Sequence, residues 1–252
     1  MKMFKYLFYI VWRCWFYAWV LLSIVPIFPV LIVVTSTESL YPAFFKIARA
    51  WGKTILFVMG FKVVFVQKQS IEKDKSYMFC PNHTSMIDIM VMLSVTNKPF
   101  VFVGKKELAR IPIFGFFYKR TCILVDRNNS KSRKAVFDEA RRRLSDGLSV
   151  CIFPEGLVPS DESIILSEFK NGAFRLAIEH QIPIVPLTFY DCKKRFSYTF
   201  FSGKPGKLRV KIHNFINTEG LTLKNINPIK KQTFDILYKE LKNDLKQQEI
   251  SN

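Results

Sequence analysis

Residues 14–37 constrain this chain most strongly, because they contain no charged side chain. About 20 apolar residues suffice to span a bilayer as a helix. Four aromatic residues gather at the N-terminal end of the run, where a belt at the membrane interface is expected: Trp12, Trp15, Tyr17 and Trp19. The run therefore predicts an N-terminal segment that associates with a membrane.

Two prolines interrupt this run. Pro26 and Pro29 each lack a backbone N–H, and each ring clashes with the preceding helical turn, so we expect the helix to kink or break there. A secretory signal peptide is the alternative interpretation. Lys2 and Lys5 supply a basic start, but no A-x-A cleavage site follows the apolar run, so we favour a broken membrane helix.

Basic residues flank the apolar run on both sides: Lys2, Lys5 and Arg13 before it, and Lys46, Arg49 and Lys53 after it. Basic residues near a membrane segment favour the cytoplasmic side. A single straight span places one basic flank outside, whereas a broken helix that enters and returns through one leaflet keeps both flanks inside. We favour this re-entrant arrangement over a full span.

Residues 41–60 predict an amphipathic helix. Apolar side chains recur at helical spacing, and three basic side chains fall on the other side. The helix either packs on its own domain or lies in the membrane interface. Its position beside the apolar run favours the interfacial interpretation.

The rest of the chain alternates between strand and helix signals. Strands are predicted at 61–66, 77–80, 100–103, 122–125, 148–153, 182–189 and 208–212, and helices at 87–95, 132–144, 172–180 and 229–247. Such alternation predicts an α/β fold in which helices cover both faces of a sheet. We expect two parts, a membrane-associating helical segment at 1–60 and a domain at 61–252.

A histidine and an aspartate lie where the strand at 77–80 ends. Ser85 and Asp88 form an S-x-x-D capping-box pattern at a helix start, which explains Ser85 and, in part, Asp88 structurally. His83 has no such explanation. Asp88 lies one turn into the helix, where its carboxylate can contact the ring of His83. His83 is therefore a candidate general base, with Asp88 fixing its tautomer.

Three further clusters are present, and each is weak by itself. Glu155 and Gly156 follow the strand at 148–153, where Gly allows close backbone approach and Glu can accept bonds from ligand hydroxyls, although a plain turn explains them too. Arg127 follows the strand at 122–125 and suits phosphate binding, although most such arginines are surface charges. The third cluster is 169–174 followed by 182–186.

The net charge of +18 indicates an anionic partner. A membrane-anchored nucleic-acid-binding protein fits that charge, but the Lys and Arg residues are dispersed and no nucleic-acid motif is present. The five cysteines contain no CxxC pair, so reduced thiols are expected. Cys80 offers one alternative chemistry, a covalent relay in which its thiolate takes a group before His83 acts.

Taken together and in this order, the four clusters resemble the glycerolipid acyltransferase family, which contains the lysophosphatidate acyltransferases. NHTSMID resembles the family's first block, TCILVDR with the upstream GKKEL and IPIFG the second, FPEG the third, and IPIVP the fourth. The resemblance covers about residues 60–215. It implies a mixed sheet flanked by helices, and bacterial members often carry a similar hydrophobic N-terminal segment.

The resemblance also implies an activity for 61–252. His83 removes the proton from a lysolipid hydroxyl, which attacks an acyl thioester, and Asp88 orients His83. The other implied substrate-binding residues are Asn82, Ser85, Lys105, Arg127, Glu155 and Gly156. The donor is an acyl group on coenzyme A or acyl carrier protein, the acceptor is lysophosphatidate, and no metal or other cofactor is required. The expected location is the cytoplasmic face of the inner membrane, among membrane lipids and without nucleic acid.

Two departures put the acceptor in doubt. The third block usually continues with Thr and Arg, where Leu157 and Val158 stand, and the second block usually opens with Gly in place of Thr121. Either another cation meets the phosphate, or the acceptor is a different lysolipid, such as a lysophospholipid or a lyso-aminolipid. A non-catalytic lipid-binding homologue is a further alternative, which the presence of both His83 and Asp88 disfavours.

Overall fold

The computed structural model describes residues 2–67, 69–126, 130–159 and 161–250. The chain forms two compact units. The first comprises Met1–Phe65, Thr84–Asn97 and Phe189–Val210, and the second comprises Val66–His83, Lys98–Thr188 and Lys211–Asn252. These units are defined by packing, whereas the division predicted at residue 60 is a functional one and stays a prediction.

The second unit is built on parallel strands in the order β6-β2-β5-β3-β4. Their bounds are β2 Met78–Pro81, β3 Phe100–Lys105, β4 Ile123–Val125, β5 Ser149–Cys151 and β6 Ile184–Phe189. Every residue of β2, β5 and β6 is buried. Parallel strands covered on both faces read as continuous apolar runs, which is why the sequence marks these segments clearly.

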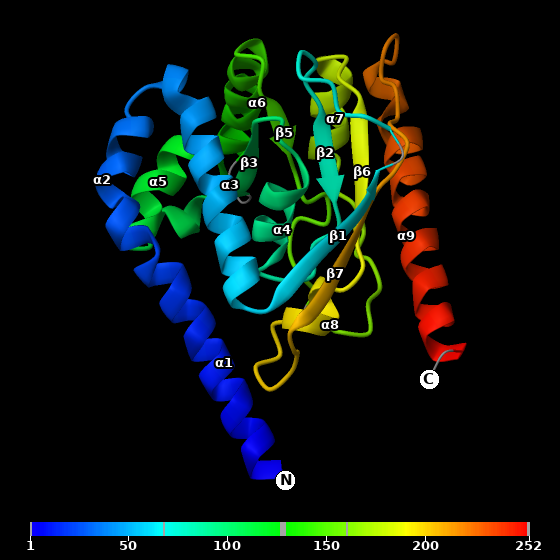
Figure 1. Ribbon diagram of the computed structural model, residues 1–252. Coiled ribbons are helices and arrows are strands. Elements are labelled where there is room, and N and C mark those ends of the chain that lie inside the picture. Colours follow the sequence, from blue (N-terminus) through cyan, green and yellow to red (C-terminus); the bar gives the residue numbers. More distant parts are fainter. Residues whose placement is uncertain (1, 68, 127–129, 160, 251–252) are drawn as a thin grey trace. The chain divides into compact units, whose positions relative to one another are not determined.

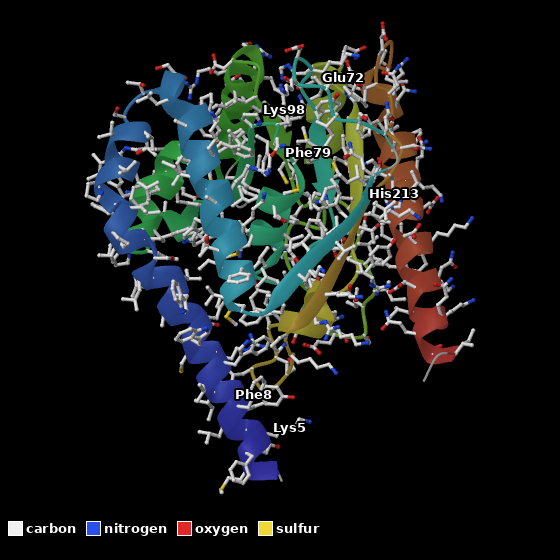
Figure 2. All side chains as sticks on the ribbon, viewed as in Figure 1. Lys5, Phe8, Glu72, Phe79, Lys98 and His213 are labelled. Carbon is white, nitrogen blue, oxygen red and sulfur yellow. The ribbon has the colours of Figure 1, made fainter. Side chains whose placement is uncertain are left out.

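Helices cover this sheet. They are α5 Phe114–Thr121, α6 Ser130–Ser145, α7 Gly172–Glu179 and α9 Ile226–Ile250, with short 3-10 turns η2 Lys106–Arg110 and η3 Leu223–Asn225. The α7 helix packs on β2, α6 packs on β4 and β5, and α9 packs on α7 (Figure 1). Phe79 of β2 is fully buried among the side chains of this core (Figure 2).

The sheet is mixed, as predicted. The β7 strand, Gly206–Ile212, lies beside β6, where the N–H of His213 donates to Pro186 and the N–H of Tyr190 donates to Arg209. Residue numbers increase along β6 in the direction in which they decrease along β7, so the two strands run antiparallel. The β1 strand, Phe61–Gln67, neighbours β7 in the first unit. All seven strands predicted from the sequence are therefore present.

The first unit is mainly helical. Its elements are α1 Lys2–Leu22, α2 Ile24–Val34, the 3-10 turn η1 Glu38–Leu40, α3 Tyr41–Val58, α4 Asp88–Val95 and α8 Cys192–Phe196. The predicted helix break is found at Ser23, three residues before Pro26, because the ring of Pro26 clashes with the carbonyl four residues back. The break expected at Pro29 does not occur, since α2 continues through this residue.

The N-terminal helices carry an apolar surface. Among the described residues, Met3–Val34 is the segment long and apolar enough to cross a membrane, a criterion of length and composition only. Only 11% of its most apolar window is buried, whereas the core helix of a soluble protein is mostly buried. Side chains such as those of Lys5 and Phe8 project from α1 (Figure 2). The segment thus supports association with a membrane.

The α3 helix packs on α4, as the packed-helix alternative expects. A Cβ atom added at Gly52 would lie 3.4 Å from the Cβ of Leu93, so Gly52 allows a close approach of the two helices. The guanidinium of Arg49 donates to the Leu93 carbonyl over 3.0 Å. Phe57 at the end of the helix is 81% exposed. The predicted contact of α3 with a membrane interface stays a prediction.

Candidate functional site

The candidate site follows the carboxyl ends of neighbouring parallel strands in the second unit. His83 lies two residues beyond β2, Glu155 lies beyond β5, and Lys105 is the last residue of β3. The register pairs Val150 of β5 with Met78 of β2 and with Val101 of β3. Carboxyl ends of parallel strands meet at one edge of the sheet, which is where α/β proteins bind ligands. Three predicted residues are thereby brought to one edge.

Glu155 is a buried carboxylate that holds two main-chain segments. Its Oε1 accepts the N–H of His83 over 2.7 Å, and its Oε2 accepts the N–H of Ser167 over 2.8 Å. The residue is 2% exposed. A buried carboxylate is costly unless it is hydrogen-bonded, and here each oxygen meets a fixed backbone donor. Glu155 therefore fixes the backbone at His83, a role that the sequence did not indicate.

The ring of His83 is half-buried and stacks on Phe153. Their centroids lie 4.1 Å apart at 24°, and Phe153 stacks in turn on Phe102 at 6.2 Å and 5°. The stack holds the imidazole ring in one orientation at the edge of the sheet. Phe153 is the first residue of FPEG, yet only the fold shows its ring against the histidine.

The FPEG turn is closed by Gly156. Its N–H donates to the Phe153 carbonyl over 3.0 Å, and its φ of +80° lies in the region that favours glycine. The chain returns to this turn at Lys170, whose N–H donates to the Pro154 carbonyl over 2.7 Å. Gly156 thus has a conformational reason to be glycine, and Lys170 lies beside the candidate site.

Two exposed lysines lie at or beside this edge. Lys105 ends β3, where it pairs in register with Val125 of β4, and Lys170 lies beside the FPEG turn. Within the described part of the chain, neither ammonium group has a hydrogen-bond or ion-pair partner. Arg127, the predicted phosphate ligand after β4, lies outside the described residues.

Asp88 begins α4 in the first unit and is fully buried. Its Oδ2 accepts the N–H groups of Thr84 and Ser85 over 2.7 and 2.8 Å. The predicted capping box is not formed, because α4 begins at Asp88 itself, with Ile87 as the N-cap and no side-chain cap. The Ser85 hydroxyl instead donates to the Phe196 carbonyl and accepts the N–H of Ile87.

A thiol also contacts Asp88. Burial, and after it the charge of Asp88 and a hydrogen bond to its carboxylate, raises the pKa of the Cys192 thiol well above its usual value. Cys192, the first residue of α8, is fully buried and thus remains a protonated donor. His83 and Asp88 belong to different units, and the pairing of their side chains stays a prediction.

Asn82 and Ser85 were both predicted to bind substrate. Each is fully buried. The Asn82 N–H donates to the Leu187 carbonyl over 3.4 Å, which continues the pairing of β2 with β6. Both residues thus contribute to the structure around His83, and their contact with substrate stays a prediction.

Cys80 is placed poorly for a covalent relay. It lies within β2, its side chain is fully buried, and burial raises the pKa of its thiol far above the usual range. The thiolate is the nucleophilic form of cysteine, and an apolar interior disfavours it. The direct mechanism therefore has the stronger support.

The other two histidines have structural surroundings. His213 is buried, and its Nε2 lies 2.8 Å from the Thr188 hydroxyl. His180 follows α7, and burial, followed by the charge of Arg141, lowers its pKa. Across the described ranges, no group of three or more His, Cys, Asp or Glu side chains is arranged to hold a metal ion.

Comparison with known proteins identifies similar sequences and similar folds. The family model described as "Acyltransferase" matches residues 62–190. A probable 1-acyl-sn-glycerol-3-phosphate acyltransferase of Mycoplasma pneumoniae is 30% identical over 186 residues, which cover 67% of this chain and 69% of that protein. The 1-acyl-sn-glycerol-3-phosphate acyltransferase of Haemophilus influenzae is 28% identical over 202 residues, which cover 79% and 82%.

A solved structure extends this similarity to the fold. The crystal structure of the 1-acyl-sn-glycerophosphate acyltransferase from Thermotoga maritima matches 96% of this chain and 97% of its own, with a TM-score of 0.74. The two sequences are 20% identical, so this likeness concerns the fold alone.

The Glu155 bridge can be tested by replacing its charge. We expect Glu155→Gln to lower the free energy of unfolding by about 1–3 kcal/mol, because glutamine turns its amide group toward one of the two N–H donors that the carboxylate now satisfies. Urea unfolding in detergent measures this change. Exposed Glu168 offers the matched control, Glu168→Gln, which should leave the unfolding curve unchanged. Equal stability of wild type and Glu155→Gln would contradict the bridging role.

Proposed function

Because the chain belongs to the acyltransferase family, we propose that it transfers a fatty acyl group from an acyl thioester to the hydroxyl of 1-acylglycerol-3-phosphate. The product is phosphatidic acid, and the released thiol is coenzyme A or acyl carrier protein. Relatives named as 1-acyl-sn-glycerol-3-phosphate acyltransferases support this acceptor. The observation that carries the proposal is His83 at the carboxyl edge of the sheet, fixed by Glu155 and stacked on Phe153.

The proposed reaction is a direct transfer. His83 accepts the proton of the acceptor hydroxyl as its oxygen attacks the thioester carbonyl, a new ester bond forms, and the C–S bond breaks. The proton then passes from the imidazolium to the thiolate that leaves. Asp88 orients the ring, and Phe153 stacks against it. General-base catalysis of this kind contributes roughly 10²–10⁴-fold to the rate.

The phosphate of the acceptor needs cationic partners. A phosphate monoester carries close to two negative charges near neutral pH, and burying it unpaired is costly. Val158 stands where the family usually has arginine, so other cations must compensate. We assign this task to Lys105 and Lys170, whose ammonium groups have no ion pairs within the described residues, together with Arg127. A different lysolipid acceptor is the alternative.

We also propose where the protein works. The apolar segment Met3–Val34 supports attachment to a membrane. The basic residues on both sides of it support a re-entrant arrangement with both termini in the cytoplasm, at the inner membrane of a bacterial cell. A lysolipid acceptor lies in that membrane, and the acyl donors are cytoplasmic anions that suit the net charge of +18.

An acceptor panel tests the activity. Membranes that contain the protein are incubated with a radiolabelled acyl donor and, in parallel, with lysophosphatidate, glycerol-3-phosphate, lysophosphatidylcholine and a lyso-aminolipid. We expect label in phosphatidic acid. His83→Ala should lower the turnover roughly 10²–10⁴-fold, because the base is removed.

His83→Ala should leave the membrane-bound fraction unchanged, since His83 lies outside the apolar segment. Wild-type turnover in this variant would overturn the mechanism. Label confined to another lysolipid would keep the acyltransferase and replace the acceptor.

The two lysines predict a specific kinetic pattern. Lys105→Ala and Lys170→Ala should each raise the KM for lysophosphatidate about 10-fold, because each removes one charge-assisted contact to phosphate. The KM for the acyl donor should change by less. Steady-state kinetics with each substrate varied in turn measures both constants. Lys239 on α9 is a control lysine, and Lys239→Ala should change neither. An unchanged acceptor KM in both site variants would remove these lysines as phosphate ligands.

The orientation of the chain predicts a labelling result. In sealed inverted vesicles, a tag at residue 1 and a tag at residue 252 should both be digested by added protease, because both termini face the cytoplasm in the re-entrant arrangement. A luminal marker protein shows that the vesicles are intact. Protection of the N-terminal tag alone would establish a full span.

A further inference from the structure

Arg13 is a buried arginine in the otherwise apolar first helix. It is 2% exposed, although it lies on α1 within the segment Met3–Val34. Its guanidinium donates to main-chain carbonyls of one loop, those of Ser197 and Thr199 over 2.8 Å, Phe200 over 3.2 Å and Ser202 over 3.3 Å. A single side chain thus fastens the loop that follows α8 to the first helix.

Aromatic packing strengthens the same attachment. The Arg13 guanidinium lies 4.1 Å from the centroid of the Phe196 ring. Trp12, directly before Arg13, and Phe16, one turn after it on α1, contact the same ring at 5.4 and 4.5 Å between centroids. Phe16 and Phe196 are 1% and 0% exposed. The last residue of α8 is therefore enclosed by the N-terminal helix.

The α8 helix in turn contacts Asp88. The Phe196 carbonyl accepts the hydroxyl of Ser85, and the Ser85 N–H donates to Asp88 over 2.8 Å. Cys192, at the start of the same helix, is fully buried, and burial, followed by the charge of Asp88, raises the pKa of its thiol. The Ser85 contact thus leads from α8 to the aspartate, and all of these residues belong to the first unit.

A simple membrane anchor has no need for such a residue. A charged side chain in an apolar segment is costly, and it is retained where it has a specific partner. Arginine suits these partners because its planar guanidinium presents five donors in a fixed fork, whereas a lysine ammonium is a single point of charge. Carbonyl groups of one loop then compensate the cation and are held in place by it.

We propose that Arg13 is a positioning residue for the acyl transfer: through Phe196 and Ser85 it holds Asp88, so that the first helix completes the catalytic apparatus in addition to attaching it to the membrane. This inference rests on the proposed function, in which Asp88 orients His83. It assigns Arg13 a role distinct from that of a basic residue flanking a membrane segment.

Kinetics of Arg13→Met in vesicles test the inference. We expect kcat to fall about 10- to 100-fold, the loss that a small misplacement of a reacting group produces. The acceptor KM and the membrane-bound fraction should stay within about twofold of wild type, because methionine keeps the helix apolar. Lys5→Met is the matched control, since Lys5 is an exposed basic residue on the same helix, and it should retain wild-type kcat.

A double-mutant cycle separates this route from a general loss of structure. Ser85→Ala removes the hydroxyl that contacts the Phe196 carbonyl. If Arg13 acts through this contact, the kcat of the double variant should lie within about twofold of the kcat of the slower single variant. Losses that multiply in full would show that Arg13 and Ser85 act independently, and this would overturn the proposal.

Arg13→Lys keeps the inference testable if Arg13→Met does not fold. Lysine retains the charge but cannot reach the same set of carbonyls, so kcat should fall and the fall should not multiply with that of Ser85→Ala. Wild-type kcat in a folded Arg13→Met or Arg13→Lys variant would overturn the proposal. An inactive wild type would instead refute the proposed function.

Discussion

Three successive main-chain N–H groups after β2 are each held by a buried carboxylate. Glu155 accepts the N–H of His83, and Asp88 accepts those of Thr84 and Ser85. An ionised carboxylate is stable in a protein interior only where fixed donors surround it, and in return it fixes those donors. The backbone that carries His83 is thereby defined on both sides of the histidine, and the other features of the candidate site build on this segment.

The membrane segment and Asp88 are connected in the first unit. In the sequence, Arg13 is one of several basic residues that flank the apolar run. In the structure, its side chain is buried against the loop after α8. That loop leads through Phe196 and Ser85 to Asp88. A helix that the sequence marks as an anchor therefore also shapes the surroundings of an aspartate more than seventy residues away, which suits an enzyme whose acceptor lies in the membrane.

The elements that the sequence predicted share one property, a strong local pattern. The buried strands are continuous apolar runs, and α6, α7 and α9 have clear helical spacing, so all were found with small errors at their ends. The α5 and α8 helices were missed. The α5 helix follows Pro112 and Ile113, and Ile113 has a φ of +63°, while α8 has only five residues, fewer than two helical turns.

The sequence by itself determined the apolar N-terminal segment, the α/β order of elements and the four motif blocks, because each depends on residues close together in the chain. Tertiary structure decided what those residues contact. Glu155 meets the backbone of a residue 72 positions away, and Arg13 meets that of a residue 187 positions away. Their partners are N–H and carbonyl groups that every position carries, so no pattern of side chains identifies them. Only folding brings these groups to the buried charges that need them.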